Sequence, residues 1–363
     1  MASHKNCLSN RRAPRQPIAP ISANRGGPTI RQSRTIAKLR FFLAIAVLAV
    51  APCAAAPAGP GPLLELRQLD QRMAVIANRL IVANAPLCES TMPATGMVLH
   101  ALAQYAPELR ETARAVFDFG SPLAVEAVTA GSAAEAAGIR AGDGLVAING
   151  QPVSAQTAES RVTSASRDAA ERRLASLPSD RPIELSLIRA GKPLAATITP
   201  EPACRTRFEV STQINTLAQS DGETIQIDAD FLQRYDDDAL AVIMAHELAH
   251  TVLRHRVRLD RAGVSKGLLA EFGRNGRLNR RAEDEADVLS VSLLRNAGID
   301  PEIAPRFWRR LGSRLQFALF GGGTHATPKA RARAMAAEIA RIPSNAPPVY
   351  RPPILDSRDR PFD

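Results

Sequence analysis

The spacing of apolar residues predicts helices in the first ordered part of the chain. Between Leu63 and Ala83, apolar residues recur every three or four positions, which is the period of an amphipathic helix. Two shorter helices are predicted at 97–105 and 107–117. We therefore expect residues 63–117 to form N-terminal helices that pack on a later domain.

From residue 118 to 202 the pattern changes to that of a small β-rich domain. Apolar and polar residues alternate at 124–128 and again within 183–198, which predicts strands. The pair Asn149-Gly150 is a strong signal for a tight turn between strands. Residues 157–177 are expected to form the main helix of this domain.

The small-residue segment of this domain is similar to PDZ domains of the type associated with bacterial proteases. Residues 133–153 read AAEAAGIRAGDGLVAINGQPV, and this segment carries the resemblance. The resemblance implies that the domain binds extended peptides by strand addition, often at a free C-terminus, with a carboxylate loop near residues 117–120. A domain that only packs against its neighbour is the alternative.

Beyond Cys204 the pattern is mainly helical. Two strand-like stretches come first, at 207–213 and 224–227. The chain after Ser344 is rich in proline and is expected to be extended or disordered. Between these regions we predict helices at 237–256, 281–297, 301–319 and 328–341.

The composition is that of a globular protein and argues against a nucleic-acid partner. Apolar residues make up 45% and charged residues 23% of the 363 residues, and only 4% are aromatic. The formal net charge is +10, but nine Lys and Arg residues precede the first acidic residue, Glu65, and without them the net charge is +1. A nearly neutral chain with few aromatic residues has little with which to bind nucleic acid.

The basic N-terminus has the features of a secretory signal peptide. Basic residues precede the uncharged run FFLAIAVLAVA at 41–51, which is shorter than the roughly 20 residues that span a membrane. We place cleavage between Ala54 and Ala58, and expect residues 1–58 to be a targeting segment of a chain exported to a bacterial periplasm. The alternatives are an uncleaved membrane anchor facing the periplasm or a lipid anchor on Cys53.

Two cysteines, Cys88 and Cys204, remain in the exported chain. In an oxidising compartment, two thiols predict one disulfide. The bridge would close a loop of more than a hundred residues, and it would stabilise the fold by roughly 4–5 kcal/mol if the effect is one of chain entropy. Two unpaired buried thiols are the alternative.

Residues 246–250 read His-Glu-Leu-Ala-His and predict a metal site. On a helix, His246 and His250 lie one turn apart and project from the same face, so both imidazoles can bind one cation. Glu247 lies beside the first histidine, where its carboxylate can act as a base toward water. His255 lies five residues beyond His250, at a different angle around the helix, and is expected to face solvent.

A catalytic zinc site needs a third protein ligand and an open position for water. The later run Glu-Asp-Glu-Ala-Asp at 283–287 puts Glu283 and Asp287 on one face of a helix. Glu283 would complete a set of two histidines and one glutamate, and Asp287 would orient a ligand histidine. An ordinary charged helix face is the alternative.

Together, the two motifs resemble those of the zinc metallopeptidases of the CAAX prenyl protease and HtpX heat-shock protease type. That family carries HExxH on one helix and ExxxD on a later helix, and both patterns are present here. The resemblance, closest to exported bacterial members with a PDZ insert, implies an α+β fold. Its parts would be a mainly helical gluzincin-type peptidase domain with a small edge sheet at 204–343, an inserted PDZ-like domain at 118–202 and a Pro-rich tail at 344–363.

The resemblance also implies further site residues. An edge strand around Asn215 would pair with the substrate backbone. A later loop would bring His325 and Arg331 to the site, where either would stabilise the oxyanion, and His325 could instead cap the zinc. The proline that usually follows this histidine is replaced by Ala326.

The sequence therefore predicts an exported metalloendopeptidase with one zinc ion per chain, in which Glu247 takes a proton from water and passes it to the leaving amine. Its partners would be extended or misfolded envelope proteins and a peptide ligand of the PDZ-like domain. A membrane would be contacted only through an uncleaved signal or a lipid anchor. The alternative is a latent or inactive metalloprotease scaffold that acts as a peptide-binding chaperone or assembly factor.

Overall fold

The computed structural model describes residues 61–154, 161–212, 214, 216–220, 222–264, 273–311 and 326–362, which all fall in one compact unit. The predicted targeting segment at 1–58, Asn215 and His325 lie outside the described residues. Within the described ranges, no helix is both long enough and apolar enough to cross a membrane.

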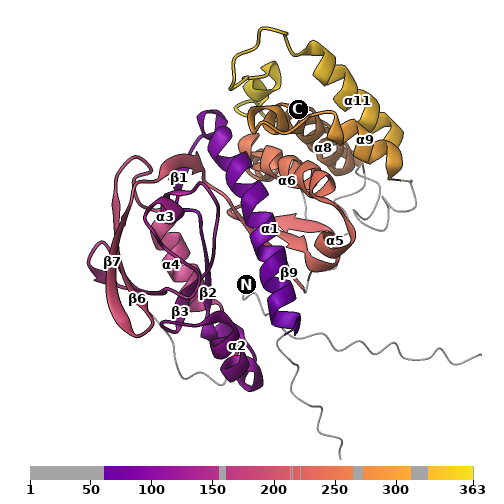
Figure 1. Cartoon of the computed structure of the whole chain (residues 1–363). Helices are drawn as coiled ribbons and strands as arrows, with labels where there is room; N and C mark the ends of the chain where they lie inside the picture. The colour runs from indigo at the N-terminus through magenta and orange to yellow at the C-terminus, as the bar shows by residue number, and fades with distance from the viewer. Residues whose placement is uncertain are drawn as a thin grey trace, which may run out of the picture. The chain divides into compact units, whose positions relative to one another are not determined.

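The C-terminal part of the chain is mainly helical, as the apolar spacing predicted. The helix α6, Asp237–Val252, begins after Asp236, whose side chain accepts a hydrogen bond from the Ala239 amide. Its residues are buried on nearly all sides, and it packs against α8, Gly273–Asn296 (Figure 1). The neighbouring helices are α5 (Ala229–Arg234), α7 (His255–Arg261), α9 (Ile303–Arg310) and α11 (Pro328–Arg341).

Two small sheets accompany these helices. β9 (Arg207–Ser211) pairs in parallel with β11 (Thr224–Asp228), and β11 pairs antiparallel with β10 (Ala218–Ser220). Among the described strands, β10 is therefore at one edge of this sheet. The second sheet is the antiparallel pair of β1 (Thr91–Ala94) and β8 (Glu201–Cys204).

The β-rich region forms one antiparallel sheet in the order β2-β3-β4-β6-β7, with β5 paired to β4. Helix α4 (Ala165–Ala175) packs its Ala170 and Leu174 into the core beneath the sheet, and α3 (Ala133–Ala136) is a single short turn. The strands are β2 (Met97–Ala101), β3 (Leu123–Val128), β4 (Gly144–Ile148), β5 (Gln151–Pro152), β6 (Ile183–Arg189) and β7 (Lys192–Ile198).

The helix predicted at 97–105 is wrong, because most of this segment is the strand β2. It pairs with β3, and a 3-10 turn, Leu102–Gln104, follows it. A short apolar run fits either a helix or a strand, and tertiary contacts decide between them. Here β2 pairs with β3, and the His100 imidazole stacks on the Phe119 ring, with centroids 4.0 Å apart.

The first helix, α1 (Gly61–Ala83), contacts both the helical part and the β-rich region. Its apolar face, which the helical spacing predicted, packs against α6, β8 and β9, and it also contacts β2 and β3. At one point Arg67 donates a hydrogen bond to the backbone carbonyl of Glu126 in β3, at 3.2 Å. The other elements between α1 and β3 are the 3-10 turns Ala85–Leu87 and Pro107–Leu109 and the helix α2, Arg110–Phe117.

The Pro-rich C-terminal segment, residues 344–362, packs against the helices, so the expectation of an extended or disordered tail is wrong. Leu355 and Phe362 are buried, and a 3-10 turn spans Pro353–Ser357. Arg295 of α8 donates hydrogen bonds to backbone carbonyl groups of the segment. The proline content did not predict this packing, because the segment is ordered by two buried apolar side chains and by hydrogen bonds from arginines on distant helices.

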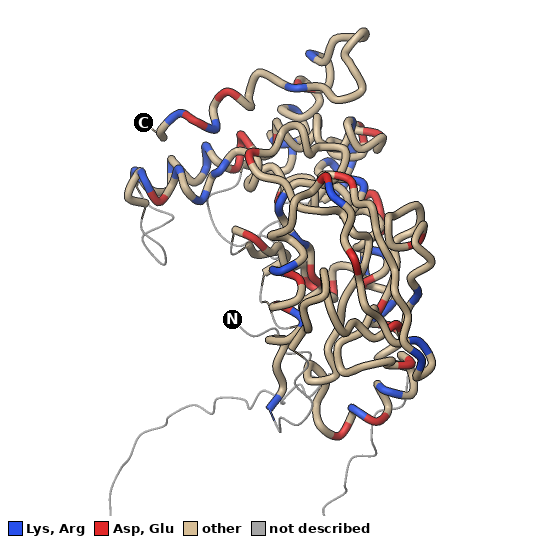
Figure 2. The backbone as a smooth tube through the Cα atoms, turned by 90° about the vertical axis from the view of Figure 1, so that its left-hand side faces the viewer, with Lys and Arg blue, Asp and Glu red and all other residues tan. Residues whose placement is uncertain are grey.

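Positive and negative side chains are mixed over the described elements (Figure 2). This distribution agrees with the nearly neutral charge of the chain beyond its N-terminus. A mixed surface of this kind gives little net attraction for a polyanion.

The predicted disulfide between Cys88 and Cys204 is present. It joins the segment after α1 to the end of β8, and the two cysteines are separated by 116 positions in the sequence. The enclosed loop contains the whole six-stranded sheet. The disulfide and the β1–β8 pairing therefore hold together the two ends of the inserted region.

Replacing both cysteines by alanine is expected to lower the free energy of unfolding by about 4–5 kcal/mol, because the unfolded chain regains the entropy of an open loop. Urea unfolding with and without a reducing agent measures the effect. Reduction should lower the midpoint of the wild-type chain and leave the double variant unchanged. A wild-type midpoint that does not move, with reduction verified by thiol titration, would contradict the prediction.

Candidate metal centre

Two histidines of α6 and one glutamate of α8 converge on one point. The Nε2 atoms of His246 and His250 lie 3.2 Å apart, and Oε2 of Glu283 lies 3.2 Å from Nε2 of His246. Oε1 of Glu283 lies 3.7 Å from Nε2 of His250. The single helical turn between the histidines and the packing of α6 against α8 produce this arrangement, which brings together the three residues selected from the sequence.

These three side chains fit a divalent cation. One ligand atom from each lies within 4.8 Å of the other two. Two imidazole nitrogens and a carboxylate oxygen are a donor set that suits zinc in catalytic sites. His246 is buried, whereas the side chains of His250 and Glu283 are 23% and 18% exposed, so solvent reaches one side of the group.

Asp287 binds the far side of the His246 imidazole. Its Oδ1 lies 3.0 Å from Nδ1 of His246, so an Nδ1–H donated to it leaves the Nε2 lone pair directed at the other two ligands. Asp287 also accepts hydrogen bonds from Nε of Arg331, at 2.6 Å, and from its Nη2. Burial raises the pKa of Asp287, but Arg331 and His246 outweigh burial and hold this pKa below its ordinary value.

The same contacts affect the protonation of His246. Burial lowers its pKa, but hydrogen bonds to Asp287 and Glu283 outweigh burial and raise the pKa to about 9. A proton on Nε2 occupies the position that a cation would use. Protons would therefore compete with a metal ion at this centre, as is usual for histidine ligands.

Arg331 lies on α11 behind His246 and not in a loop over the site. It is 1% exposed, and its guanidinium carbon lies 3.5 Å from the centroid of the Trp308 ring. The side chain holds Asp287, and the expected role of Arg331 in stabilising an oxyanion stays a prediction. The helix predicted at 328–341 is α11, which begins at Pro328, so Arg331 lies near the start of this helix.

Glu247 directly follows His246 on α6, and its side chain is half-buried. Its carboxylate therefore combines access to solvent with a fixed position on the helix that carries two of the converging ligands. A carboxylate in such a position can accept a proton from water and return it to a leaving group.

His255 is buried, which corrects the expectation that it faces solvent. It is 1% exposed, and its Nδ1 lies 2.9 Å from Nδ1 of His250. The helix α6 ends at Val252, and Arg254 has a left-handed backbone with φ of 56°, so α7 starts in a new direction and returns His255 to the site. Burial lowers the pKa of His255 to about 4. The periodicity of one continuous helix could not reveal this contact, because two helices supply it.

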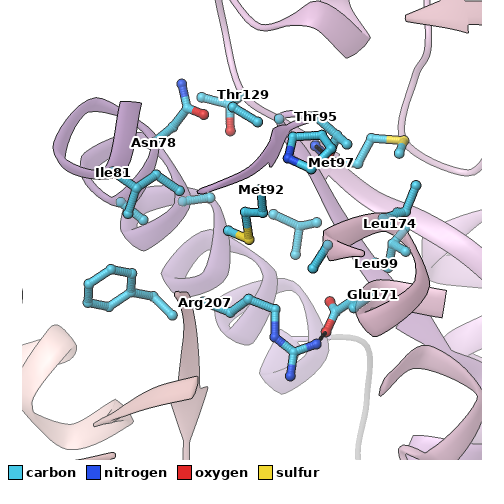
Figure 3. A pocket seen from close by; sticks show the side chains of 18 of the residues that line it. Asn78, Ile81, Met92, Thr95, Met97, Leu99, Thr129, Glu171, Leu174 and Arg207 are labelled. Atoms are coloured by element: carbon cyan, nitrogen blue, oxygen red, sulfur yellow. Dashed lines mark hydrogen bonds and ion pairs between the residues drawn. The ribbon is translucent and has the colours of Figure 1, made fainter. Parts of the chain in front are cut away.

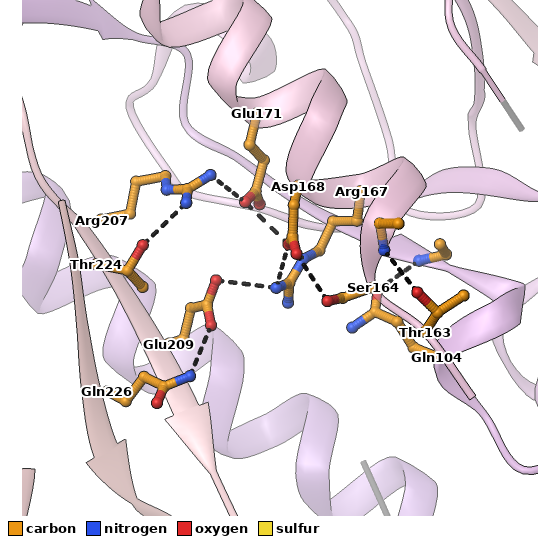
Figure 4. Close-up of polar contacts among 12 residues, drawn as sticks. Gln104, Thr163, Ser164, Arg167, Asp168, Glu171, Arg207, Glu209, Thr224 and Gln226 are labelled. Atoms are coloured by element: carbon orange, nitrogen blue, oxygen red, sulfur yellow. Dashed lines mark hydrogen bonds and ion pairs between the residues drawn. The ribbon is translucent and has the colours of Figure 1, made fainter. Parts of the chain in front are cut away.

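A second group of charged side chains joins α4 to β9 (Figure 4). Arg167 donates to Glu209 at 2.9 Å, and Arg207 donates to Glu171 at 2.8 Å. Arg167 also binds Asp168 at 2.6 Å. Three carboxylates thus meet two guanidinium groups that already bridge them, and we assign no metal to this cluster.

A slot with a volume of about 160 Å³ lies between β2, α4 and α1 (Figure 3). The consecutive residues 95–99 line it, which means that the backbone edge of β2 faces the cavity, and β2 is the terminal strand of its sheet as described. Arg207 and Glu171 form an ion pair at one end of the slot. Residues 117–120, where the carboxylate loop was expected, are not among the residues that line it.

Comparison with known families and proteins gives two matches in sequence. Residues 195–274 match the family described as Peptidase family M48, and residues 124–170 match the PDZ domain family. The first match includes the HELAH motif and ends before Glu283. The curated protein "Mitochondrial metalloendopeptidase OMA1" of Schizosaccharomyces pombe (strain 972 / ATCC 24843) is 30% identical over 118 residues, which is 27% of this chain and 35% of that protein. The match thus spans about a third of the length of OMA1.

Two solved structures are similar to part of this chain. The HtrA3 PDZ domain bound to a phage-derived ligand (FGRWV) is 23% identical, with 31% of this chain and 89% of that chain covered and a TM-score of 0.23. The HtrA-type protease AlgW with a decapeptide is 17% identical, with 31% of this chain and 30% of that chain covered and a TM-score of 0.23.

The Glu171→Gln substitution is expected to remove a pH dependence of stability. Burial raises the pKa of Glu171 to about 7 from 4.5, against the opposing effect of Arg167 and Arg207, so the folded chain holds this proton more tightly than the unfolded chain does. The stability contributed by protonation is present below pH 4.5 and is lost as the pH rises to about 7, by at most about 3 kcal/mol. The melting temperature of the variant relative to the wild type should therefore rise from about pH 5 to about pH 8.

The matched control is Glu108→Gln, which removes an exposed carboxylate at the start of a 3-10 turn. Its melting temperature relative to the wild type should change little over the same pH range. A difference between Glu171→Gln and the wild type that does not vary with pH would show that Glu171 does not hold the proton.

Proposed function

We propose that this chain, which contains a peptidase family M48 domain and a PDZ domain, is a zinc-dependent endopeptidase that acts on extended or misfolded proteins of the cell envelope. The observation that carries the proposal is the convergence of His246, His250 and Glu283, with Glu247 on the same helix as the two histidines. The metalloendopeptidase named as a relative supports this type of reaction.

The three converging residues would hold the zinc ion, and the residues around them would perform the proton transfers. Zinc at such a site supplies a Lewis acid that makes water a better nucleophile and polarises a peptide carbonyl. Glu247 accepts the proton of the attacking water and passes it to the leaving amine. Asp287, held by Arg331, keeps the His246 imidazole in the tautomer that presents Nε2 to the metal.

An edge strand supports substrates in an extended conformation, and two further features support a location outside the cytoplasm. β10 is the edge strand of its sheet as described, and an extended chain can add to such an edge through backbone hydrogen bonds. Asn215, which lies outside the described residues, precedes this strand by three positions. The Cys88–Cys204 disulfide and the predicted targeting segment at 1–58 both favour an exported protein, which we place in the bacterial periplasm.

The PDZ domain would select substrates or regulate the peptidase through the slot beside β2. The open backbone edge of β2 suits strand addition by a peptide, and apolar side chains of α4 and α1 line part of the remaining walls, together with residues 92–94 and 206–209. Because α1 also packs against α6, a peptide in the slot would contact a helix that touches the metal-binding helix.

The mature chain is expected to hold about one zinc ion, measured by metal analysis, and Glu283→Gln is expected to hold little. Asp284→Asn is the matched control, because it removes the neighbouring exposed carboxylate on the same helix and should leave zinc bound. A Glu283→Gln variant with a full complement of zinc would exclude Glu283 as the third ligand.

Glu247→Gln is expected to keep its zinc and to lose peptidase activity by about 10²–10⁴-fold, because only the proton transfer is removed. Cleavage of an unfolded protein such as casein measures the activity. Wild-type turnover in this variant would remove Glu247 from the mechanism. Zinc-loaded wild type that cleaves no unfolded protein would instead favour the latent scaffold that acts as a chaperone or assembly factor.

A further inference from the structure

We propose that His255 is a positioning residue that holds the metal ligand His250 in its metal-binding tautomer, and that Glu285 and the C-terminal segment hold His255 in turn. The inference rests on the proposed zinc site. It assigns a role to a histidine outside both metal motifs and to residues at the far end of the chain.

The contacts form a continuous series that runs away from the metal centre. Nδ1 of His255 lies 2.9 Å from Nδ1 of His250, and Nε2 of His255 lies 3.3 Å from Oε2 of Glu285. The same carboxylate accepts hydrogen bonds from Arg258 at 2.6 Å and from Arg281 at 3.1 Å. All members of the series except Arg281 and His250 are buried.

The direction of each hydrogen bond follows from the chemistry of Glu285. Its carboxylate is held by two arginines and can only accept, so Nε2 of His255 must donate to it. In a neutral imidazole the other nitrogen then lacks a hydrogen, which makes Nδ1 of His255 the acceptor from His250. His250 therefore carries its hydrogen on Nδ1, and its Nε2 lone pair is free to bind the cation beside His246 and Glu283.

The two metal-binding histidines are thus held in the same tautomer by different means. Nδ1 of His246 is bound directly by the carboxylate of Asp287, at 3.0 Å. Nδ1 of His250 is bound instead by the His255 imidazole, and the carboxylate of Glu285 binds the other nitrogen of that imidazole. Partners of this kind fix the orientation of a histidine ligand and increase its affinity for metal.

The C-terminal segment covers this series of hydrogen bonds. The Phe362 ring lies over Arg258, with the guanidinium carbon 3.9 Å from the ring centroid, and Nε of Arg258 donates to the carbonyl of Arg360 at 3.0 Å. Ser357 donates to Oε2 of Glu285 at 3.3 Å. With this cover, the side chains of Arg258 and Glu285 are only 3% and 8% exposed, so little water competes for the hydrogen bonds that orient His255.

Two substitutions in the full mature chain test the role of His255. His255→Leu removes both hydrogen bonds and is expected to weaken zinc affinity by about 10–100-fold, measured by competition with a chelator. His255→Gln keeps an acceptor and a donor in one side chain and should restore most of the affinity. His100→Leu removes a buried histidine of the β-rich region and should leave zinc affinity unchanged.

Folding is checked separately by circular dichroism and by the melting temperature in the presence of EDTA. A folded His255→Leu variant that binds zinc as tightly as the wild type would overturn the inference and leave the zinc site intact. A wild-type chain that binds no zinc would overturn the proposed function as well. The two failures are therefore distinguishable.

A measurement on the zinc-loaded wild type needs no variant. Nitrogen-15 NMR of the imidazoles reports which ring nitrogen carries the hydrogen. We expect hydrogen on Nδ1 of His250 and on Nε2 of His255. Hydrogen on Nδ1 of His255 would contradict the inference, because that nitrogen could then not accept from His250.

Discussion

The packing of α6 against α8 is the contact on which the rest of the structure depends, because it buries ionisable groups that must be paired. His246 and Asp287 are each 2% exposed. A buried carboxylate without partners is strongly destabilising, so Asp287 requires both His246 and Arg331. The helix α11 must then dock where it delivers Arg331, and Trp308 of α9 covers the guanidinium. The helix packing and the candidate metal centre are therefore a single arrangement.

The supports of the centre come from segments that are far apart in the sequence. His246 is held through Asp287 by α11, whereas His250 is held through His255 by α7, α8 and the last residues of the chain. Each support is buried, which strengthens its hydrogen bonds and restricts the rotation of the imidazole it holds. A candidate site held in this way is as rigid as the packing of the helices around it.

The β-rich region is an insertion whose two ends are tied together. The β1–β8 pair and the Cys88–Cys204 disulfide close it, and the ion pairs between α4 and β9 join it to the small sheet of the peptidase region. The slot beside β2 is walled by α1, the helix whose apolar face packs on α6. Direct contact of this kind is what a peptide in the slot would need to influence α6, the helix that carries His246 and His250.

The sequence by itself determined the features that depend on local periodicity. One helical turn separates His246 from His250, the amphipathic spacing defines α1 and α11, and strict alternation defines β6. These patterns are repeated within single elements, so no distant contact is needed to recognise them. Only the tertiary structure decided that β2 is a strand, that His255 is buried beside His250, that Arg331 holds Asp287 and that the C-terminal segment is ordered. In each of these cases the partner lies on another element. A contact between distant segments does not change the spacing of apolar residues in either segment, so the sequence pattern cannot reveal it.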